Sequence, residues 1–267
     1  MNITASVVSH GHAEETGQLL DRLAALPPPG ARRVIVTLNV PDPRALGDWR
    51  AARWPFDLAL VENARPAGFG ANHNRAMRLD HERGASDLFA VLNPDLRWRR
   101  DPFAPMRALL AGSPRVGLVY PAQRDSQGRP QDSERLAPTP ARLWARYRPG
   151  GRRLELAPGQ PPDWVNAAFM LLRREALASV GGFDERYHMY CEDVDLCLRL
   201  QLAGWQLARA GDAVVEHRAR RASHRDARHL AWHLSSLWRL WRSPAWRAWR
   251  ERGAGGDDFG ETTEMES

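Results

Sequence analysis

Three carboxylates stand within four positions, Glu192, Asp193 and Asp195, directly before an apolar run at 196–202 that predicts a helix. A carboxylate in such a place suits a general base that takes a proton from a substrate hydroxyl. The same groups could instead complement the positive end of the helix dipole, and Asp195 could pair with Arg199 one turn further on. Asp193 is therefore the better candidate for the base, and Asp195 is more consistent with helix structure.

A second carboxylate, Asp95, follows an apolar run in the sequence Asn93-Pro94-Asp95. A carboxylate held rigid by a preceding proline at the end of a central strand is well placed to bind a divalent cation against a diphosphate. The alternative is an ordinary turn, because Asn, Pro and Asp are all good turn formers. His217 ends the last apolar run and is either a metal ligand or a partly exposed polar residue.

Two glycines flank Phe69 just before a predicted helix at 68–79. Glycines at a helix start let backbone N–H groups approach an anion. The motif is short, so by itself it is a weak indication of a phosphate site.

Elements that would position these groups alternate between strand and helix along the first hundred residues. Strands are predicted at 3–9, 33–38, 57–61 and 87–92, and helices at 16–26 and 68–79. This alternation favours a parallel α/β sheet, in which ligands bind beyond the carboxyl ends of the strands. His10, Asn39, Asn63 and Asn93 fall at those ends.

The second half of the chain is less regular. Residues 120–162 are rich in Pro, Gly, Arg and Gln and are predicted to form an irregular excursion over the active face. Strand-like runs return at 163–173 and 213–217. After residue 223, tryptophans and arginines alternate, which predicts one helix or two, broken near Pro244. The expected organisation is a domain at 1–223, a Trp/Arg-rich helical extension at 224–252 and an acidic, disordered tail at 253–267.

Composition limits the classes of protein that fit. The chain has 267 residues, 43% of them hydrophobic, and a formal charge of +6 carried entirely by arginine. Arginine favours anionic partners such as nucleotides or anionic lipids, while the scattered distribution and lack of a binding motif argue against nucleic acid. No apolar run approaches the ~20 residues of a membrane span. Two closely spaced cysteines favour a reducing compartment, so a cytoplasmic protein, or one peripheral on the inner face of the cytoplasmic membrane, is expected.

Two segments, 163–174 and 181–205, resemble family 2 glycosyltransferases of the GT-A fold, in the bacterial branch of rhamnosyltransferases. The resemblance runs from about residue 4 to 223. It implies a single domain with a mostly parallel, Rossmann-like sheet flanked by helices and followed by a helical extension. It also implies an inverting, metal-dependent enzyme of polysaccharide or glycan synthesis. Such an enzyme moves a sugar from a nucleotide-diphosphate donor to a hydroxyl of a saccharide or lipid-linked saccharide.

The resemblance also assigns roles residue by residue. Asp193 would be the base, with Glu192 and Trp164 at the acceptor. Asp95 and His217 would bind Mn²⁺ or Mg²⁺, the histidine favouring Mn²⁺. The nucleotide-sugar site would be lined by seven residues: Ser9, Asn39, Gly68, Phe69, Asn74, Asn93 and Asp95.

Several positions depart from the family pattern. The family's Thr-Tyr-Asn after the first strand is here Ser9-His10-Gly11, and its Asp-Asn after the second strand is Leu38-Asn39. An asparagine usual before Gly-Phe is Pro66, and the glycine after the family histidine is lost in the arginines at 218–221. These changes leave the base and metal positions intact but alter the nucleotide pocket.

Other interpretations stay open on the sequence alone. A nucleotidyltransferase would share the strands and the metal aspartate, although residues 9–16 lack the basic phosphate loop of that class. A non-catalytic, glycosyltransferase-like binding module would explain the altered pocket. The tryptophans and arginines of 224–252 fit either peripheral membrane contact or packing on the domain or in a homodimer.

Overall fold

A computed structural model describes residues 1–27, 30–148, 150–151, 156, 159–217 and 227–254. The strands are β1 (Ile3–His10), β2 (Arg33–Val40), β3 (Asp57–Glu62), β4 (Leu88–Leu92), β5 (Leu96–Arg97), β6 (Val116–Arg124), β7 (Glu134–Arg135), β8 (Trp164–Val165), β9 (Phe169–Arg173) and β10 (Gln206–His217). The helices are α1 (Ala13–Ala24), α2 (Pro43–Ala51), α3 (Phe69–Glu82), α4 (Phe103–Gly112), α5 (Pro140–Tyr147), α6 (Arg174–Ser179), α7 (Glu192–Leu202), α8 (Ala227–Arg242) and α9 (Pro244–Ala254).

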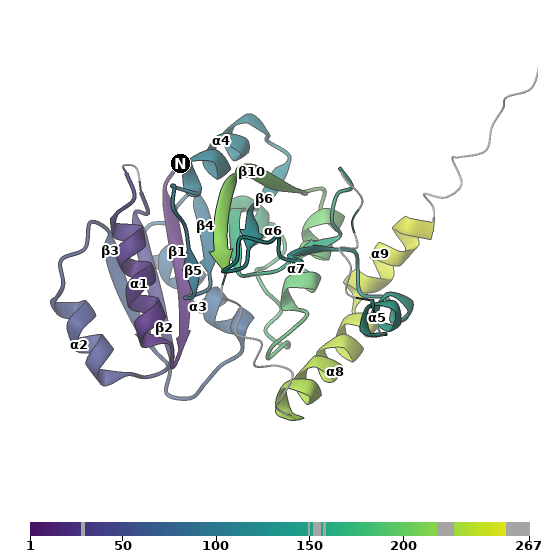
Figure 1. Ribbon diagram of the computed structural model, residues 1–267, viewed down its shortest axis with the longest axis horizontal. Coiled ribbons are helices and arrows are strands. Elements are labelled where there is room, and N and C mark those ends of the chain that lie inside the picture. The colour runs from purple at the N-terminus through teal and green to yellow at the C-terminus, as the bar shows by residue number, and fades with distance from the viewer. Residues whose placement is uncertain (28–29, 149, 152–155, 157–158, 218–226, 255–267) are drawn as a thin grey trace, which may run out of the picture.

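Eight strands form one sheet in the order β3-β2-β1-β4-β9-β6-β10-β5 (Figure 1). The first four strands are parallel to one another, and β6 is parallel to β10. Strand β9 runs antiparallel between β4 and β6, and the short β5 is antiparallel to β10. The predicted α/β sheet is therefore confirmed, with an antiparallel strand at its centre.

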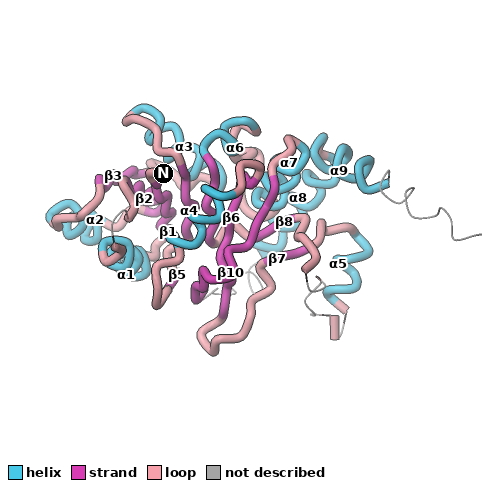
Figure 2. Tube along the Cα trace, turned by 90° about the horizontal axis from the view of Figure 1, so that it is seen from above, coloured by secondary structure: helices cyan, strands magenta, loops and turns pink. Residues whose placement is uncertain are grey.

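Helices cover both faces of the sheet, and each face has its own apolar core. Helices α1, α2 and α4 cover one face, while α3, α6 and α7 cover the other, as Figure 2 shows for α1 and α2 opposite α3, α6 and α7. Period-two alternation in β1 explains the division, because Ile3, Ala5 and Val7 enter one core. Thr4 and Ser6 point to the other face and contact α3.

A buried ionic cluster around Asp80 fixes α3 to the sheet. The Asp80 carboxylate accepts hydrogen bonds from the hydroxyl of Thr4 at 2.6 Å and from the guanidinium groups of Arg33 and Arg174, each at 2.7 Å. Its side chain is fully buried. The surrounding donors satisfy a charge that would otherwise be costly to remove from water.

The excursion at 120–162 is more regular than the sequence predicted. Strand β6 continues to Arg124, and both β7 and α5 lie within the excursion. Helix α5 has an explicit start signal, since the Thr139 hydroxyl accepts a hydrogen bond from Arg142 N–H at 3.2 Å and Pro140 occupies the first turn. The Pro- and Gly-rich composition obscured this signal.

Helices α8 and α9 pack their inner sides on the domain beside α7. Leu237, Leu240 and Trp246 are buried in the core that includes α7. The Trp241 indole N–H donates to the carbonyl of Pro138 at 2.9 Å, just before α5. Among the described residues, no helix has the length and apolar character needed to cross a membrane. Most of the predicted acidic tail, from residue 255 on, and the arginines at 218–221 lie outside the described residues.

Candidate active site

Strand pairing brings Asp95 and His217 together although they are far apart in sequence. Asp95 immediately precedes β5, and Leu96 pairs with His217 at the end of β10. The Asp95 Oδ1 to His217 Nε2 distance is 3.5 Å, and Asn93 Nδ2 lies 3.4 Å from the same ring nitrogen. The two predicted metal ligands thus face each other at one edge of the sheet.

The hydrogen bonds of Gln131 determine which nitrogen of His217 carries the proton. Gln131 Nε2 donates to the His217 carbonyl at 2.6 Å, so its Oε1, 3.2 Å from His217 Nδ1, must accept. Nδ1 therefore holds the hydrogen, and the lone pair of Nε2 accepts from Asn93 Nδ2 at 3.4 Å while Asp95 Oδ1 lies beside it. Burial lowers the pKa of His217 more than Asp95 raises it, which favours this neutral ring.

A neutral imidazole lone pair beside a carboxylate is the donor set of a divalent cation, and an imidazole whose other N–H is fixed by a hydrogen bond is the usual arrangement. Within the described part of the chain, no group of three or more acidic, histidine or cysteine side chains could hold a metal ion. The described residues therefore offer Asp95 and His217 as ligands, and a cation bound here could complete its coordination with oxygens from phosphate or water.

The carboxylates Glu192 and Asp193 begin α7 after a strained stretch of backbone. Tyr190 and Cys191 have φ angles of 72° and 63°, in the left-handed region that non-glycine residues rarely adopt. Such strain persists where surrounding structure enforces it, and it is concentrated at functional sites. Here it turns the chain so that the first two helical residues carry their carboxylates inward.

Burial raises the pKa of both carboxyl groups. The Glu192 side chain is buried, one of its oxygens (Oε2) has no hydrogen-bond partner, and the charge of Asp193 raises its pKa further. For Asp193 the pKa increase from burial is opposed by backbone N–H groups of Val194 and Ala167 and by the charge of Arg135. As the pH rises, Asp193 therefore loses its proton before Glu192 does. Asp193 is then able to accept a proton while Glu192 is still a neutral acid.

Two adjacent backbone units connect the carboxylate pair to the metal-ligand pair. The N–H of Ala167 donates to the Asp193 carboxylate, and the carbonyl of Ala168 accepts from Asn93 N–H at 2.8 Å. Asn166, next in line, exchanges hydrogen bonds with Gln123 at 2.7 and 3.1 Å. Residues 166–168 thus hold both halves of the site in one rigid frame.

The other predicted acceptor residue, Trp164, lies in the ribbon that β8 forms with β7. Its indole is buried and donates to the carbonyl of Leu136 at 2.9 Å, while Arg135 lies over the ring at 5.1 Å. Arg135 also acts electrostatically on Asp193. The ribbon therefore borders the base, and a contact between Trp164 and the acceptor stays a prediction.

Ser9 and Asn39 end β1 and β2 next to each other, and both side chains are buried. The Asn39 side-chain amide makes two hydrogen bonds with Ala67 in the loop before α3. Its oxygen accepts from Ala67 N–H at 2.7 Å, and its nitrogen donates to the Ala67 carbonyl at 3.0 Å. It also accepts from Asn63 at 2.8 Å. Asn39 thus shapes the loop at the sheet edge, and its contact with a nucleotide stays a prediction.

Gly68, Phe69 and Asn74 connect α3 to the loop that precedes the carboxylates. Phe69 N–H donates to the carbonyl of His188 at 3.0 Å, and a Cβ on Gly68 would stand 2.8 Å from the same oxygen. Asn74 bridges to Phe183, accepting from its N–H at 2.9 Å and donating to its carbonyl at 2.8 Å. These contacts position residues 183–188, and a contact of the same three residues with the donor stays a prediction.

Comparison with known proteins decides the family. Residues 152–255 match the model of the glycosyl transferase family group 2. The chain is 32% identical over 230 residues to the N-acetylglucosaminyl-diphospho-decaprenol L-rhamnosyltransferase of Mycobacterium tuberculosis, which covers 76% of this chain and 74% of that relative. The chain belongs to the family 2 glycosyltransferases.

Further relatives agree with this assignment. The glycosyltransferase is 44% identical over 82 residues to the rhamnosyltransferase WbbL of Escherichia coli, covering 29% of this chain and 30% of that one. The fold matches a mannosyltransferase of Pyrobaculum calidifontis, solved with GDP-Man and Mn²⁺, with a TM-score of 0.61 and 19% identity over 98% of this chain and 76% of that one. It also matches GalNAc-T7, solved with UDP, GalNAc and Mn²⁺, with a TM-score of 0.62, 13% identity and coverage of 82% and 44%. These two likenesses establish the GT-A-like fold.

Several residues that build the site of this glycosyltransferase are not marked by the sequence. Gln131 sets the tautomer of His217, Ala167 and Ala168 act only through their backbones, and Arg135 acts at a distance. Asn166, Ala167 and Ala168 do stand in the segment that carries the family resemblance, but nothing in their residue types indicates these contacts. Asp195 was predicted to pair with Arg199, and the pair forms at 2.6 Å in a buried setting.

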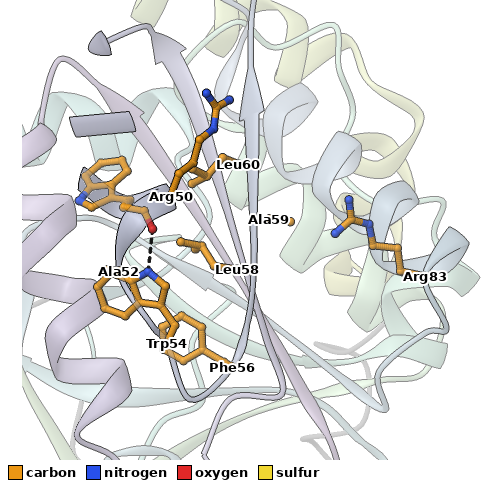
Figure 3. Close-up of a pocket in the computed structure, with 9 residues that line it drawn as sticks. Arg50, Ala52, Trp54, Phe56, Leu58, Ala59, Leu60 and Arg83 are labelled. Carbon is orange, nitrogen blue, oxygen red and sulfur yellow. Dashed lines mark hydrogen bonds between the residues drawn. The ribbon is translucent and has the colours of Figure 1, made fainter. Parts of the chain in front are cut away.

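A cavity of about 410 Å³ lies at the other end of the glycosyltransferase, beside the edge strand β3. Figure 3 shows its aromatic wall, where Trp54 N–H donates to the Trp49 carbonyl at 2.9 Å, together with Arg50 and Arg83. None of the predicted site residues lines this cavity. It is therefore separate from the chemistry at the carboxyl edge of the sheet.

Proposed function

We propose that this glycosyltransferase transfers L-rhamnose from a nucleoside-diphosphate donor to a hydroxyl of a prenyl-diphosphate-linked saccharide, with inversion at the anomeric carbon. The relatives named for transfer to a lipid-linked N-acetylglucosamine and for rhamnose transfer support this choice of donor and acceptor. The observation that carries the mechanism is the frame at 166–168, which fixes Asp193 to the turn that bears Asp95.

Asp193 is the base in this proposal. Its raised pKa makes its carboxylate a better proton acceptor than an ordinary exposed aspartate, and it remains ionised at neutral pH more readily than Glu192 does. Glu192, kept neutral by burial and by its neighbour, can donate a hydrogen bond to an acceptor hydroxyl and orient it. Attack from the face opposite the leaving diphosphate gives inversion.

Asp95 and His217 would hold a divalent cation, which when bound neutralises the negative charge that builds on the leaving nucleoside diphosphate. Structures with Mn²⁺ among the fold relatives support the choice of metal. The fixed Nδ1 hydrogen of His217 leaves Nε2 as an acceptor, and a bound cation would take the place of the Asn93 N–H that Nε2 accepts from at 3.4 Å. Gln131 is thus a positioning residue for this pair.

One reconstitution tests the proposed function. Purified protein is incubated with nucleoside-diphospho-L-rhamnose, a water-soluble short-chain prenyl-diphospho-N-acetylglucosamine and Mn²⁺, and the product is identified by mass and by NMR of the new anomeric centre. The expected product is a disaccharide on the lipid diphosphate with inverted anomeric configuration, formed only with metal.

The alternatives give other results. Donor binding without turnover under any condition would indicate a non-catalytic binding module. A product that retains the donor's anomeric configuration would exclude direct displacement with Asp193 as base. Transfer from a different nucleotide sugar in a donor panel would correct the sugar while leaving the mechanism in place.

A further inference from the structure

Helix α8 presents an apolar stripe to solvent on its outer side. Leu230, Leu234 and Trp238 follow one another at intervals of four residues, so they lie on one helix face, and their side chains are 57%, 57% and 60% exposed. Among the described residues, eight large hydrophobic side chains are exposed, and five of them belong to α5 and α8. Because five of the eight exposed large hydrophobic side chains lie on these two helices, this end of the molecule has the character of an interaction surface.

The same helices are basic and contain no acidic residue. On α8, Arg239 and Arg242 are exposed, and the Arg242 guanidinium lies 4.5 Å from the ring centre of Trp238. Beyond α5, exposed Arg148 lies over the exposed Trp144 at 5.5 Å. On a bilayer with anionic lipids, the apolar side chains would enter the boundary of the acyl chains and the arginines would contact the headgroups. The interleaved leucine, tryptophan and arginine side chains fit such a surface.

Helices α5 and α8 are fixed to each other at this end of the molecule. The hydrogen bond from Trp241 of α8 to the carbonyl of Pro138 anchors the start of α5 beside α8, and both views show the two helices at the end away from α2 (Figures 1 and 2). A helix of 16 residues lying flat would extend about 24 Å along a surface. It is too short and too polar to cross one.

The inner side of α8 contacts the loop that leads into the carboxylates. Tyr190 Oη and His229 Nδ1 are 2.8 Å apart, and Ser236 Oγ donates to the Met189 carbonyl at 2.8 Å. The rings of His188 and Trp232 lie 4.7 Å apart. One side of α8 therefore presents the apolar stripe to solvent, and the opposite side packs against the strained loop before Glu192.

The start of α8 also lies close to the carboxyl edge of the sheet. Asn39, at the end of β2, holds Ala67 in the loop before α3, the N–H of Phe69 donates to the His188 carbonyl, and the His188 ring packs on Trp232 of α8. A surface bound to the outer side of α8 would thus lie toward the carboxyl edge of the sheet, the edge at which Asp95 and His217 also stand. A prenyl diphosphate embedded in that surface would present its headgroup saccharide at this edge.

We propose that the outer face of α8, formed by Leu230, Leu234, Trp238, Arg239 and Arg242, binds the surface of an anionic lipid bilayer and thereby places the acceptor saccharide at the catalytic carboxylates. The inference rests on the proposed lipid-linked acceptor for its functional meaning, while the binding itself does not depend on it. A second copy of the chain fits less well, because a two-fold contact through this face would bring arginines against arginines without any acidic partner on α5 or α8.

The test uses the full chain and vesicles of either phosphatidylcholine alone or equal parts phosphatidylcholine and phosphatidylglycerol, read by co-sedimentation. The apolar variant is Leu230→Ser/Leu234→Ser/Trp238→Ser, and the charge variant is Arg239→Gln/Arg242→Gln. The matched control is Arg53→Gln/Arg115→Gln, which removes two exposed arginines from loops elsewhere in the chain. All substituted side chains are exposed, so thermal unfolding should confirm that each variant is folded.

The wild type and the control should bind the anionic vesicles. The apolar variant should lose roughly tenfold or more of this binding, and the charge variant should lose its preference for anionic over neutral vesicles. Equal binding of the wild type and the apolar variant, or no binding of the wild type, would overturn the proposal. So would a wild-type dimer in light scattering that the apolar variant converts to a monomer, since a second copy would then cover this face.

Transfer assays separate this inference from the proposed function. With the water-soluble acceptor, the apolar variant should match the wild type, and with the acceptor embedded in anionic vesicles it should be slower by about the factor lost in binding. If the wild type transfers no sugar to either acceptor, the proposed function fails, while vesicle binding still decides whether the face is a membrane surface. Equal rates of the two proteins on vesicle-embedded acceptor would remove the positioning role.

Discussion

The adjacent carboxylates Glu192 and Asp193 give a prediction in which activity and stability change in opposite directions. Both groups are held in the folded state with raised pKa values, by burial in each case and for Glu192 also by the charge of Asp193. A carboxyl group whose folded pKa is raised contributes stability below its unfolded pKa, and that contribution is lost as the pH rises through the folded pKa. Near neutral pH the pair is therefore a source of instability, and neutral replacements should stabilise the protein.

The expected magnitudes follow from the two roles. In Asp193→Asn, an amide oxygen can still accept the hydrogen bonds from Val194 and Ala167, but the group cannot take a proton. Loss of a general base lowers kcat by about 10²–10⁴, or roughly 3–5 kcal/mol of transition-state stabilisation. The same change relieves the repulsion felt by Glu192 and should raise stability by on the order of 1 kcal/mol, or roughly 2–4 °C in Tm for a chain of this size.

Glu192→Gln provides the comparison. Glutamine imitates the protonated form of Glu192, so turnover should fall far less than in Asp193→Asn. The stabilising effect of Glu192→Gln should grow as the pH rises above 4.5, the ordinary pKa of a glutamate. Above that pH an unfolded chain ionises this group freely, whereas the folded wild type must keep it protonated or ionise it in a buried site.

The assays are steady-state transfer kinetics, donor affinity by calorimetry and thermal unfolding across pH. Glu175→Gln, an exposed glutamate at the start of α6, is the matched control and should change none of them. Near-wild-type turnover of Asp193→Asn would refute the base assignment. A drop in the stability of Asp193→Asn near neutral pH would refute the account of the pair as mutually destabilising.

Other predictions test the remaining parts of the site and its support. Asp95→Asn and His217→Gln should each raise the Mn²⁺ concentration needed for half-maximal activity at least tenfold, while His81→Gln, on the exposed end of α3, leaves it unchanged. The acid limb of kcat/KM should fall as the pH decreases through the raised pKa of Asp193, above the ordinary 3.8, and Glu192→Gln should leave that limb in place. Asp80→Ala should destabilise the fold by about 3–5 kcal/mol in chemical denaturation, since Arg33 and Arg174 would lose their buried partner. Gly68→Ala should lower kcat in steady-state transfer kinetics, because its Cβ would meet the His188 carbonyl at 2.8 Å and displace the loop before the carboxylates, whereas Gly47→Ala, with open space around it, serves as the silent control.

The sequence predicted the parallel half of the sheet because each of its strands is a short apolar run flanked by clear breaks, and β1, β2 and β4 are buried along almost their whole length. β1, β2, β3 and β4 lie within two residues of their predicted limits. It did not predict β9 as an antiparallel strand between β4 and β6, since strand direction depends on where the chain returns and not on the residues of the strand. Helix α4 and strand β5 were also not predicted. Strand β5 has only two residues and is recognisable only through its pairing with β10.

In the site, as in the sheet, the sequence indicates which side chains are chemically capable but not how the chain arranges them. Asp95, Asp193 and His217 could be proposed from the sequence because each is a chemically capable residue at the end of an element; the structure brings Asp95 and His217 to 3.5 Å, and their roles stay predictions. The backbone groups of Ala167 and Ala168 leave no mark in residue types, so no pattern of side chains could indicate them. The His217 tautomer likewise depends on Gln131, which is brought to the site only by the turn that follows β6.

The loop 188–191 is where these supports converge, and its strain explains why it needs them. Two consecutive non-glycine residues in the left-handed region cost of order 1–3 kcal/mol each, so the loop would relax unless its neighbours opposed this. Opposition comes from both sides: Phe69 N–H and the close approach of Gly68 fix His188, while Ser236 and His229 of α8 fix Met189 and Tyr190. Because the carboxylates begin the helix that this loop starts, the two contacts from α8 help to set the direction in which Glu192 and Asp193 point. The supports of the loop thus come from both α3 and α8, and the proposed membrane-binding face lies on the same helix as two of them.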